Sequence, residues 1–413
     1  MPTPASAPQS SPVLHSRPVA YAVRADFFRP SPVRAVFDIS MREGMISLAG
    51  GNPDLGVLPL DELGAVAGRL IAEHGLEVLQ YGTGAGLEPL REAVCEVMST
   101  AGIRAVPGDI LITSGSQMGL ELVTSLLCDP GDVVLVEAPT YVGAIGTFQG
   151  LEADIVHVAC DDDGLIPAEL ERTIAEVRAQ GRTIKLLYTI PNFNNPSGIT
   201  LHPDRRPVVA ELCRNAGIAL VEDDPYGLLD FWDTPLQAIR SFDESVIYLG
   251  SMSKIFSPGI RIGWVLAPRD VRDRLQLAAE ATTICPSVLS QHLANIYLRE
   301  FDWRGYMNRA IDRYHERAQR LDAALAAHLP ESVRWTRPHG GFFVWLTLPE
   351  GLSAEALLPR GIEEGVVFVP GTAFFGDGSG DGNLRLSFSL ESPDRIEEGV
   401  RRLARVVTAA LEI

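Results

Sequence analysis

From residue 108 onward, short apolar runs alternate with stretches of helical spacing. The seven apolar runs have the length of buried strands and cover residues 110–113, 133–137, 154–158, 184–189, 218–222, 246–250 and 260–267. Helical stretches lie between them at 118–128, 141–149, 167–180 and 204–216. This alternation predicts an α/β domain with a mostly parallel, seven-stranded sheet. Such sheets bind their ligands at the carboxyl ends of the strands.

The flanking segments have different patterns. Residues 1–18 are rich in Pro, Ser and Ala, whereas residues 288–328 have the spacing of one or two long helices. The runs at 340–346 and 384–389 indicate strands of a smaller α+β domain. We therefore expect a disordered tail at 1–30, an N-terminal arm at 31–60, a large domain at 61–300 and a small C-terminal domain at 301–413.

Composition narrows the class of protein. The chain has 413 residues, 46% of them apolar, and a formal net charge of −18, which argues against nucleic acid or an anionic membrane surface as a partner. Its five cysteines are scattered without a C-x-x-C pair, so they predict neither a metal site nor a disulfide framework. No apolar run approaches the ~18 residues of a membrane helix. We expect a cytoplasmic protein.

One lysine stands at an unusual place. Lys254 follows the apolar run 246–250 within Ser251-Met252-Ser253-Lys254. A buried ammonium is costly unless it is paired or neutralised, and a lysine escapes that cost by forming an imine with an aldehyde such as pyridoxal phosphate (PLP). Ser251, Ser253 and Arg261 are near in sequence and suit a phosphate dianion. A solvated lysine on a surface turn is the alternative for an isolated motif of this kind.

Two further motifs follow predicted strands and suit parts of a flat, phosphorylated cofactor. Ser116 and Gln117 open a helix after a small-residue turn, which is a ready anion site, although tight turns of this kind are common. Tyr141, in Ala-Pro-Thr-Tyr, could stack on a heterocycle, although a packing role is the simpler interpretation.

Two more motifs add polar groups at strand ends. The rigid turn 191–198 presents Asn195, which could donate to a phenolate-type oxygen. The acidic motif 222–226 ends an apolar strand, where a carboxylate could pair with a protonated ring nitrogen and keep the ring an electron sink. A metal site or a helix cap would also explain the acidic pair.

In combination, these motifs resemble the fold-type I PLP-dependent aminotransferases of class I/II, and most closely the 2-aminoadipate/kynurenine aminotransferase subgroup. The resemblance extends from about Ser31 to the C-terminus. It rests on the motifs S-G-S-Q, A-P-T-Y, N-N-P-S-G, E-D-D-P-Y, S-M-S-K with Arg261, and L-R-L-S-F-S.

The resemblance implies a role for each matched residue. Lys254 would be the Schiff-base lysine and proton carrier, Asp223 would face the pyridine nitrogen, and Tyr226 with Asn195 would face the ring oxygen. Tyr141 would stack on the ring. The phosphate would be held by Ser116, Gln117, Ser251, Ser253 and Arg261.

The substrate side of the site follows from the same resemblance. Arg385 would grip the α-carboxylate, and strand alternation agrees, because Leu384, Leu386 and Phe388 share the opposite face. Tyr81 would reach the phosphate of the other subunit, which makes the active unit a homodimer. Arg34, Gly51 and Ile284 match positions that line the substrate pocket, together with Asn195.

Arg34 could pair with a distal carboxylate or stack on an aromatic ring, so amino acids with acidic or aromatic side chains are expected. The chain departs from the family pattern near this pocket, at Asn52, Leu58 and Cys285.

Two other classes share the scaffold. A PLP-dependent lyase, γ-replacement or annulating enzyme of specialised metabolism would keep the same cofactor residues. The sensor domain of a transcription regulator would carry a DNA-binding domain ahead of the fold. Arg385 and the pyridinium partner Asp223 favour transamination between an L-amino acid and a 2-oxo acid.

Overall fold

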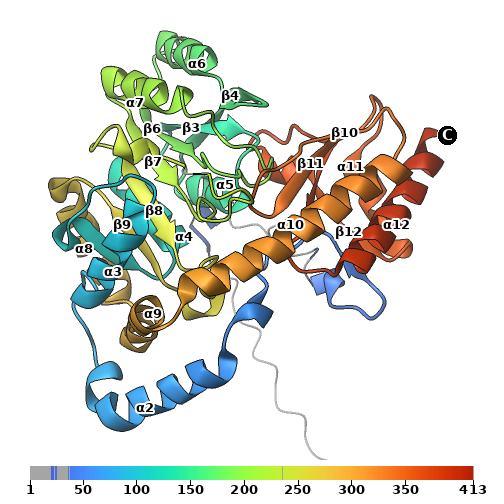
Figure 1. Ribbon diagram of the computed structural model, residues 1–413. Helices are drawn as coiled ribbons and strands as arrows, with labels where there is room; N and C mark the ends of the chain where they lie inside the picture. Colours follow the sequence, from blue (N-terminus) through green and yellow to red (C-terminus); the bar gives the residue numbers. More distant parts are fainter. Residues whose placement is uncertain (1–19, 23, 26–35, 37, 235, 413) are drawn as a thin grey trace, which may run out of the picture.

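The computed structural model describes residues 20–22, 24, 25, 36, 38–234 and 236–412. A body built on a large sheet and a smaller C-terminal body are spanned by one long helix, α10 (Trp303–His328) (Figure 1). The boundary that we propose between residues 300 and 301 falls between α9 (Val288–Glu300) and α10. Most of the predicted tail and the first residues of the arm, including Arg34, lie outside the described residues.

In the part of the chain that the structure describes, the large sheet contains all seven predicted strands and one more, the two-residue β5, so it has eight strands where seven were predicted. Its order is β2-β9-β8-β7-β6-β3-β4-β5. The bounds are β2 Ile110–Thr113, β3 Val133–Ala138, β4 Asp154–Asp161, β5 Gly164–Leu165, β6 Ile184–Thr189, β7 Ala219–Asp223, β8 Ile247–Ser251 and β9 Gly263–Leu266. The strands from β8 to β4 in this order are parallel, whereas β9 is antiparallel to both of its neighbours and the two-residue β5 is antiparallel to β4.

Helices cover both faces of this sheet because its strands are apolar on both sides. On β3, Val134 and Val136 join one core cluster, while Val133 and Leu135 join another. The second cluster is closed by α6 (Pro167–Ala179) and α7 (Arg205–Ala216), which lie side by side in Figure 1. The first cluster contains residues of α3 (Glu88–Ser99), α4 (Ser116–Leu127), α5 (Val142–Gly150) and α8 (Arg269–Thr283).

The small body is an antiparallel sheet backed by helices. Its strand order is β10-β11-β14-β13, with bounds Arg334–Trp335, Phe343–Thr347, Asn383–Ser387 and Val369–Pro370. The helices α11 (Ala354–Glu363) and α12 (Pro393–Leu411) belong to it, and α12 packs along α10. The arm strand β1 (Ile46–Ser47) pairs with β12 (Val366–Val367), so the arm is tied to the small body.

Helix α2 (Leu60–Val78) lies at the margin of the large body (Figure 1). It buries Val66, Leu70 and Val78, whereas Leu76 is 97% exposed and Ile71 is 44% exposed. Among the described helices, none is both long and apolar enough to cross a membrane.

The strand directions bring the predicted motifs to one edge of the sheet. Strands β2, β3, β6, β7 and β8 all end there, and the antiparallel β9 begins there, since Gly263 pairs with both Thr113 and Ser251. Arg261 precedes β9 and therefore lies beside the segments that follow β2 and β8. Because β9 is antiparallel, the Arg261 cation lies at the same edge of the sheet as the hydroxyls and carboxylates that follow the other strands.

Candidate active site

A cleft of about 630 Å³ opens at this edge of the large sheet and extends to the small body. Twelve of the predicted site residues line it: Gly51, Ser116, Gln117, Tyr141, Asn195, Asp223, Tyr226, Ser251, Ser253, Lys254, Arg261 and Arg385. Asn52, Val142, Gly143, Gly146 and Phe343 also line it. The cleft therefore combines three cationic side chains, one carboxylate and two phenols.

The first part of the cleft is an anion cradle. Gly115, at φ +85°, precedes α4, and its conformation turns the backbone so that Ser116 begins the helix. The Arg261 guanidinium donates from Nη2 to the Ser114 carbonyl at 3.0 Å, and a Cβ on Gly115 would lie 2.3 Å from that nitrogen. The Ser251 hydroxyl accepts from the Ser253 N–H at 3.1 Å. A helix N-terminus, two serines and an arginine together suit a phosphate dianion.

Asp223 lines the same cleft and has one carboxylate oxygen without a hydrogen-bond partner. It is buried, and its Oδ2 accepts from the Tyr188 hydroxyl at 2.7 Å, whereas its Oδ1 is buried without a hydrogen-bond partner. Burial raises the pKa of this carboxyl to about 7, the Tyr188 hydrogen bond opposes that rise, and the charge of Asp224 adds to it. A buried, unpaired carboxylate oxygen suits a cationic ring N–H, so the residues present fit pyridoxal phosphate.

The neighbouring Asp224 is already satisfied. It accepts from Asn192 Nδ2 and the Gly227 N–H, both at 2.9 Å, and from the Tyr248 hydroxyl at 3.1 Å. Through these three hydrogen bonds, Asp224 stabilises the turn that follows β7. Of the two adjacent aspartates, Asp223 is therefore the one with an oxygen available to a ligand.

Lys254 also lines the cleft and lies among aromatic rings. Its Nζ donates to the Gly51 carbonyl at 2.8 Å and lies 5.3 Å from the centroid of the Phe342 ring and 5.9 Å from that of Tyr226. Burial lowers the pKa of the amine to about 8, and the positive charges of Arg385 and Arg261 add to this effect. A lowered pKa favours the neutral amine, which is the form that attacks an aldehyde or accepts a proton.

Arg385 reaches the cleft from β14 and is 2% exposed, so it is not a solvated strand arginine. Its Nη1 donates to Asn195 Oδ1 at 2.7 Å and its Nη2 donates to the Ala49 carbonyl at 2.5 Å. The guanidinium carbon lies 4.2 Å from the ring centroid of Phe343 and 4.9 Å from that of Phe374. Burial lowers the pKa of this guanidinium to about 10, so the group is a desolvated cation held in a fixed orientation.

The remaining polar side chains brace the cleft. Tyr226 is buried, which raises the pKa of its phenol above the ordinary value, and its hydroxyl interacts with the Asn195 side chain. Tyr141 directly precedes α5, and burial likewise raises the pKa of its phenol. Gln117 donates from Nε2 to the Gly143 carbonyl at 3.1 Å and to Thr147 Oγ1 at 2.7 Å. Its amide nitrogen thus ties α4 to α5.

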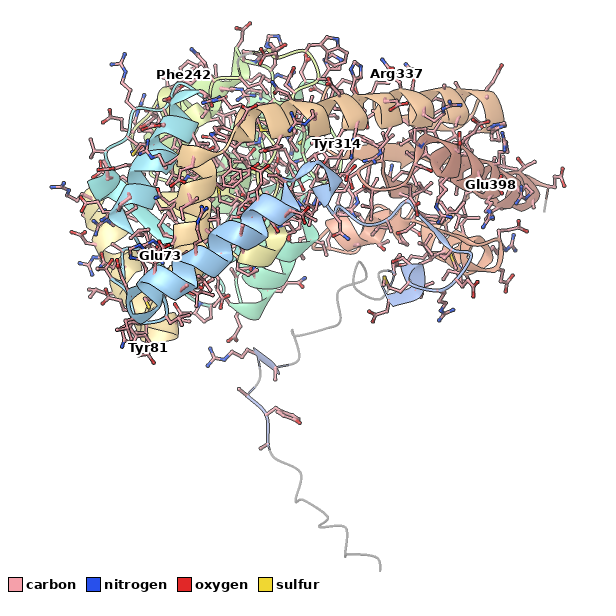
Figure 2. The ribbon with its side chains drawn as sticks, turned by 60° about the horizontal axis from the view of Figure 1, so that its bottom comes forward. Glu73, Tyr81, Phe242, Tyr314, Arg337 and Glu398 are labelled. Carbon is pink, nitrogen blue, oxygen red and sulfur yellow. The ribbon has the colours of Figure 1, made fainter. Side chains whose placement is uncertain are left out.

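Two predicted residues do not reach this cleft. Tyr81 is 74% exposed and lies at the outer end of α2 (Figure 2), and Ile284 is 57% exposed at φ +65°. Their loops contact each other, since the Gly82 N–H donates to Cys285 Sγ at 3.4 Å. Arg34 lies outside the described residues, so its predicted role is untested.

Sequence reasoning missed two residues that shape the site. Tyr188 lies inside an apolar run that has the pattern of an ordinary buried strand, and only the pairing of β6 with β7 brings it to Asp223. Phe343 belongs to the predicted strand 340–346, but its contact with Arg385 depends on the pairing of β11 with β14. Neither contact has a signal in the local sequence, because both depend on register between distant segments.

The chain is similar to known proteins in both sequence and structure. The sequence profile described as aminotransferase class I and II matches residues 43–403. The chain is 36% identical, over 94% of both chains, to aromatic-amino-acid aminotransferase 1 of Thermococcus litoralis. It also resembles the crystal structure of a Pyrococcus horikoshii kynurenine aminotransferase in complex with PMP, with a TM-score of 0.90 and 35% identity over 95% of this chain and 98% of the other.

A third similar protein is the α-aminoadipate aminotransferase of Thermus thermophilus, whose structure holds N-(5'-phosphopyridoxyl)-L-leucine. Its TM-score to this chain is 0.87 and its identity 36%, over 95% of this chain and 98% of the other.

Proposed function

The chain belongs to the class I and II aminotransferase family, and we propose that the cleft described above is its active site, with the residues around it in the roles given below. The protein is a PLP-dependent aminotransferase that moves an amino group between an amino acid and a 2-oxo acid. The observation that carries the assignment of the site is the unpartnered Oδ1 of buried Asp223 in the same cleft as Lys254. An acid and an amine placed so are the two groups that PLP chemistry requires of a protein.

The cofactor-binding roles that we propose are supported by the common cleft that these residues line. The phosphate would be held at the start of α4 by Ser116, Gln117, Ser251, Ser253 and Arg261. Tyr141 would stack on the ring, Tyr226 and Asn195 would bind its oxygen, and Asp223 would bind its nitrogen. When bound, the cofactor supplies an aldehyde and an electron-withdrawing ring.

Lys254 and Arg385 act on the substrate. The Arg385 fork binds the α-carboxylate in two parallel hydrogen bonds, which orients the substrate Cα toward the amine of Lys254. Because the pKa of Lys254 is lowered to about 8, its Nζ is able to accept the Cα proton near neutral pH and return it later. Asn195 accepts a hydrogen bond from Arg385 Nη1. It therefore contributes both to binding the ring oxygen and to orienting the arginine that binds the α-carboxylate.

The substrate side chain would extend past Gly51 toward Arg34 and Ile284. An aromatic or distal acidic side chain suits an arginine at that point, and the three similar proteins carry aromatic, kynurenine and α-aminoadipate activities in their names. A panel of amino acids tests this choice. Aromatic and acidic members should release a 2-oxo acid and leave the pyridoxamine form on the enzyme, and an Arg34→Ala variant should lose those substrates more than alanine.

We propose further that the enzyme is a cytoplasmic homodimer. The exposed Tyr81, Leu76 and Leu79 at the end of α2 are 74%, 97% and 66% exposed, a concentration of apolar surface that a second subunit would cover. Tyr81 would then complete the partner's phosphate site, and Ile284 its substrate pocket. All five cysteines are free thiols, as is usual in a reducing compartment. Sedimentation at assay concentration measures the assembly, and an active monomer would contradict it.

A further inference from the structure

The hydrogen bond between Tyr188 and Asp223 has a consequence for the chemistry of the site. The two side chains come from adjacent parallel strands, β6 and β7, in which Tyr188 pairs with Val221. Tyr188 is fully buried, and its ring packs edge-on against Phe148 with centroids 5.7 Å apart. Its hydroxyl therefore cannot turn toward water, and it donates to Asp223 Oδ2 at 2.7 Å.

This donor governs which form Asp223 takes. Burial destabilises the carboxylate, and Asp224 adds a repulsive charge, so a hydrogen bond to Oδ2 is what opposes protonation. Burial and Asp223 raise the pKa of the Tyr188 phenol well above its ordinary value, so the phenol keeps its proton. In a site of low dielectric, an ion pair between carboxylate and ring N–H competes with a neutral pair, in which the proton has moved to the carboxylate. A fixed donor to Oδ2 stabilises the carboxylate more than the neutral acid, because a charged oxygen accepts the stronger hydrogen bond.

We propose that Tyr188 is a positioning residue for the amino-group transfer: its hydroxyl holds Asp223 as an anion with Oδ1 directed at the cofactor, and thereby keeps the ring nitrogen protonated. The inference rests on the proposed role of Asp223. Tyr188 acts only through Asp223 and contacts neither substrate nor cofactor. The proton of the ring nitrogen stays on the nitrogen while the tyrosine keeps its own proton, so no proton is transferred between the three groups.

The chain supplies a matched control. Tyr248 lies on β8, on the other side of β7, and donates at 3.1 Å to Asp224, the aspartate that has three donors and no free oxygen. Both tyrosines are buried and both bind an aspartate of the same pair. Replacing either by Phe keeps the ring and removes only the hydroxyl, so the two variants differ in which carboxylate loses a donor.

The experiment reconstitutes wild type, Tyr188→Phe, Tyr248→Phe and Asp223→Asn with PLP labelled with ¹⁵N in the ring, and records the ¹⁵N chemical shift. Circular dichroism confirms that each variant is folded. In Tyr188→Phe the signal should move from the protonated position toward that of Asp223→Asn, and kcat should fall roughly tenfold to a hundredfold, the range of one hydrogen bond to a charged group. In Tyr248→Phe the signal should stay at the wild-type position.

Three results would overturn the inference in different ways. A wild-type signal in Tyr188→Phe, with a displaced signal in Asp223→Asn, would reject the role of Tyr188 and leave the proposed site intact. A wild-type signal in both variants would show that Asp223 does not face the ring nitrogen, and the role of Tyr188 would fall with it. Equal displacement in Tyr188→Phe and Tyr248→Phe would also reject the inference, because a general loosening of the strands would then explain both.

Discussion

Replacing Arg385 by lysine should separate its geometry from its charge. The guanidinium makes two hydrogen bonds of 2.7 and 2.5 Å, to Asn195 and Ala49, and packs between two rings. A lysine keeps one positive charge but loses the planar fork that binds a carboxylate through two donors. Each lost charge-assisted hydrogen bond costs roughly 2 kcal/mol, so kcat/KM should fall about 30-fold for one bond and about 1,000-fold for two.

The assay is the single half-reaction, followed by the change in cofactor absorbance on mixing with an amino acid. PLP should bind Arg385→Lys as tightly as wild type, because Arg385 takes no part in the phosphate cradle. Arg240→Lys is the matched control, since Arg240 is also buried and bonds the Val246 carbonyl at 2.6 Å, outside the residues that line the cleft. It should lose stability without losing kcat/KM. A kcat/KM for Arg385→Lys within twofold of wild type, or an equal loss in both variants, would refute the proposed grip on the α-carboxylate.

Three other predictions test separate parts of the site. The pKa of Lys254 is lowered from 10.5 to about 8 by folding. Between pH 8 and pH 10.5 the unfolded chain therefore holds a proton on Lys254 that the folded chain does not. Lys254→Met should therefore raise the free energy of unfolding of the apoprotein by roughly 3 kcal/mol below pH 8, and by progressively less toward pH 10.5; urea titrations that show a pH-independent difference would contradict this. Gly115→Ala should weaken PLP binding at least tenfold, which equilibrium titration measures. Gly131→Ala, at the same φ of +85° but with open space around the new methyl group, should not weaken it. Mixing inactive Tyr81→Phe and Lys254→Ala subunits should restore part of the activity, because one site of each mixed dimer is then intact; no recovery would argue against a shared site.

The strand–helix alternation predicted the large sheet well. All seven apolar runs became strands, because strands buried between two layers of helices are apolar on both faces and are bounded by turn residues. The pattern does not reveal that β9 runs antiparallel, which is what carries Arg261 to the edge occupied by Ser251. The direction of a strand depends on how the chain crosses the sheet. The residues at 260–267 have no local pattern that distinguishes a parallel strand from an antiparallel one.

For the cleft, residues inside recognisable motifs could be predicted and residues outside them could not. Asp223 was distinguished from Asp224 by resemblance alone, whereas the structure distinguishes them physically, since Asp224 has three donors and Asp223 has one. Tyr188 could not be predicted, because the sequence around a tyrosine in an apolar run does not indicate whether its hydroxyl donates to a carboxylate or to a backbone carbonyl. Tyr81 and Ile284 lie outside the cleft of a single chain, and the sites that we propose for them belong to a second subunit.

The covalent attachment of the cofactor tests the central claim most directly. The chain contains two lysines, Lys185 and Lys254. Lys185 lies on β6, 3.5 Å from the carboxylate of Asp132, and does not line the cleft, so it offers a built-in comparison. Borohydride reduction of the PLP-loaded protein, followed by peptide mass spectrometry, should place the phosphopyridoxyl group on Lys254, with Lys185 unmodified. Modification of Lys185 instead, or of neither lysine, would contradict the proposed active site.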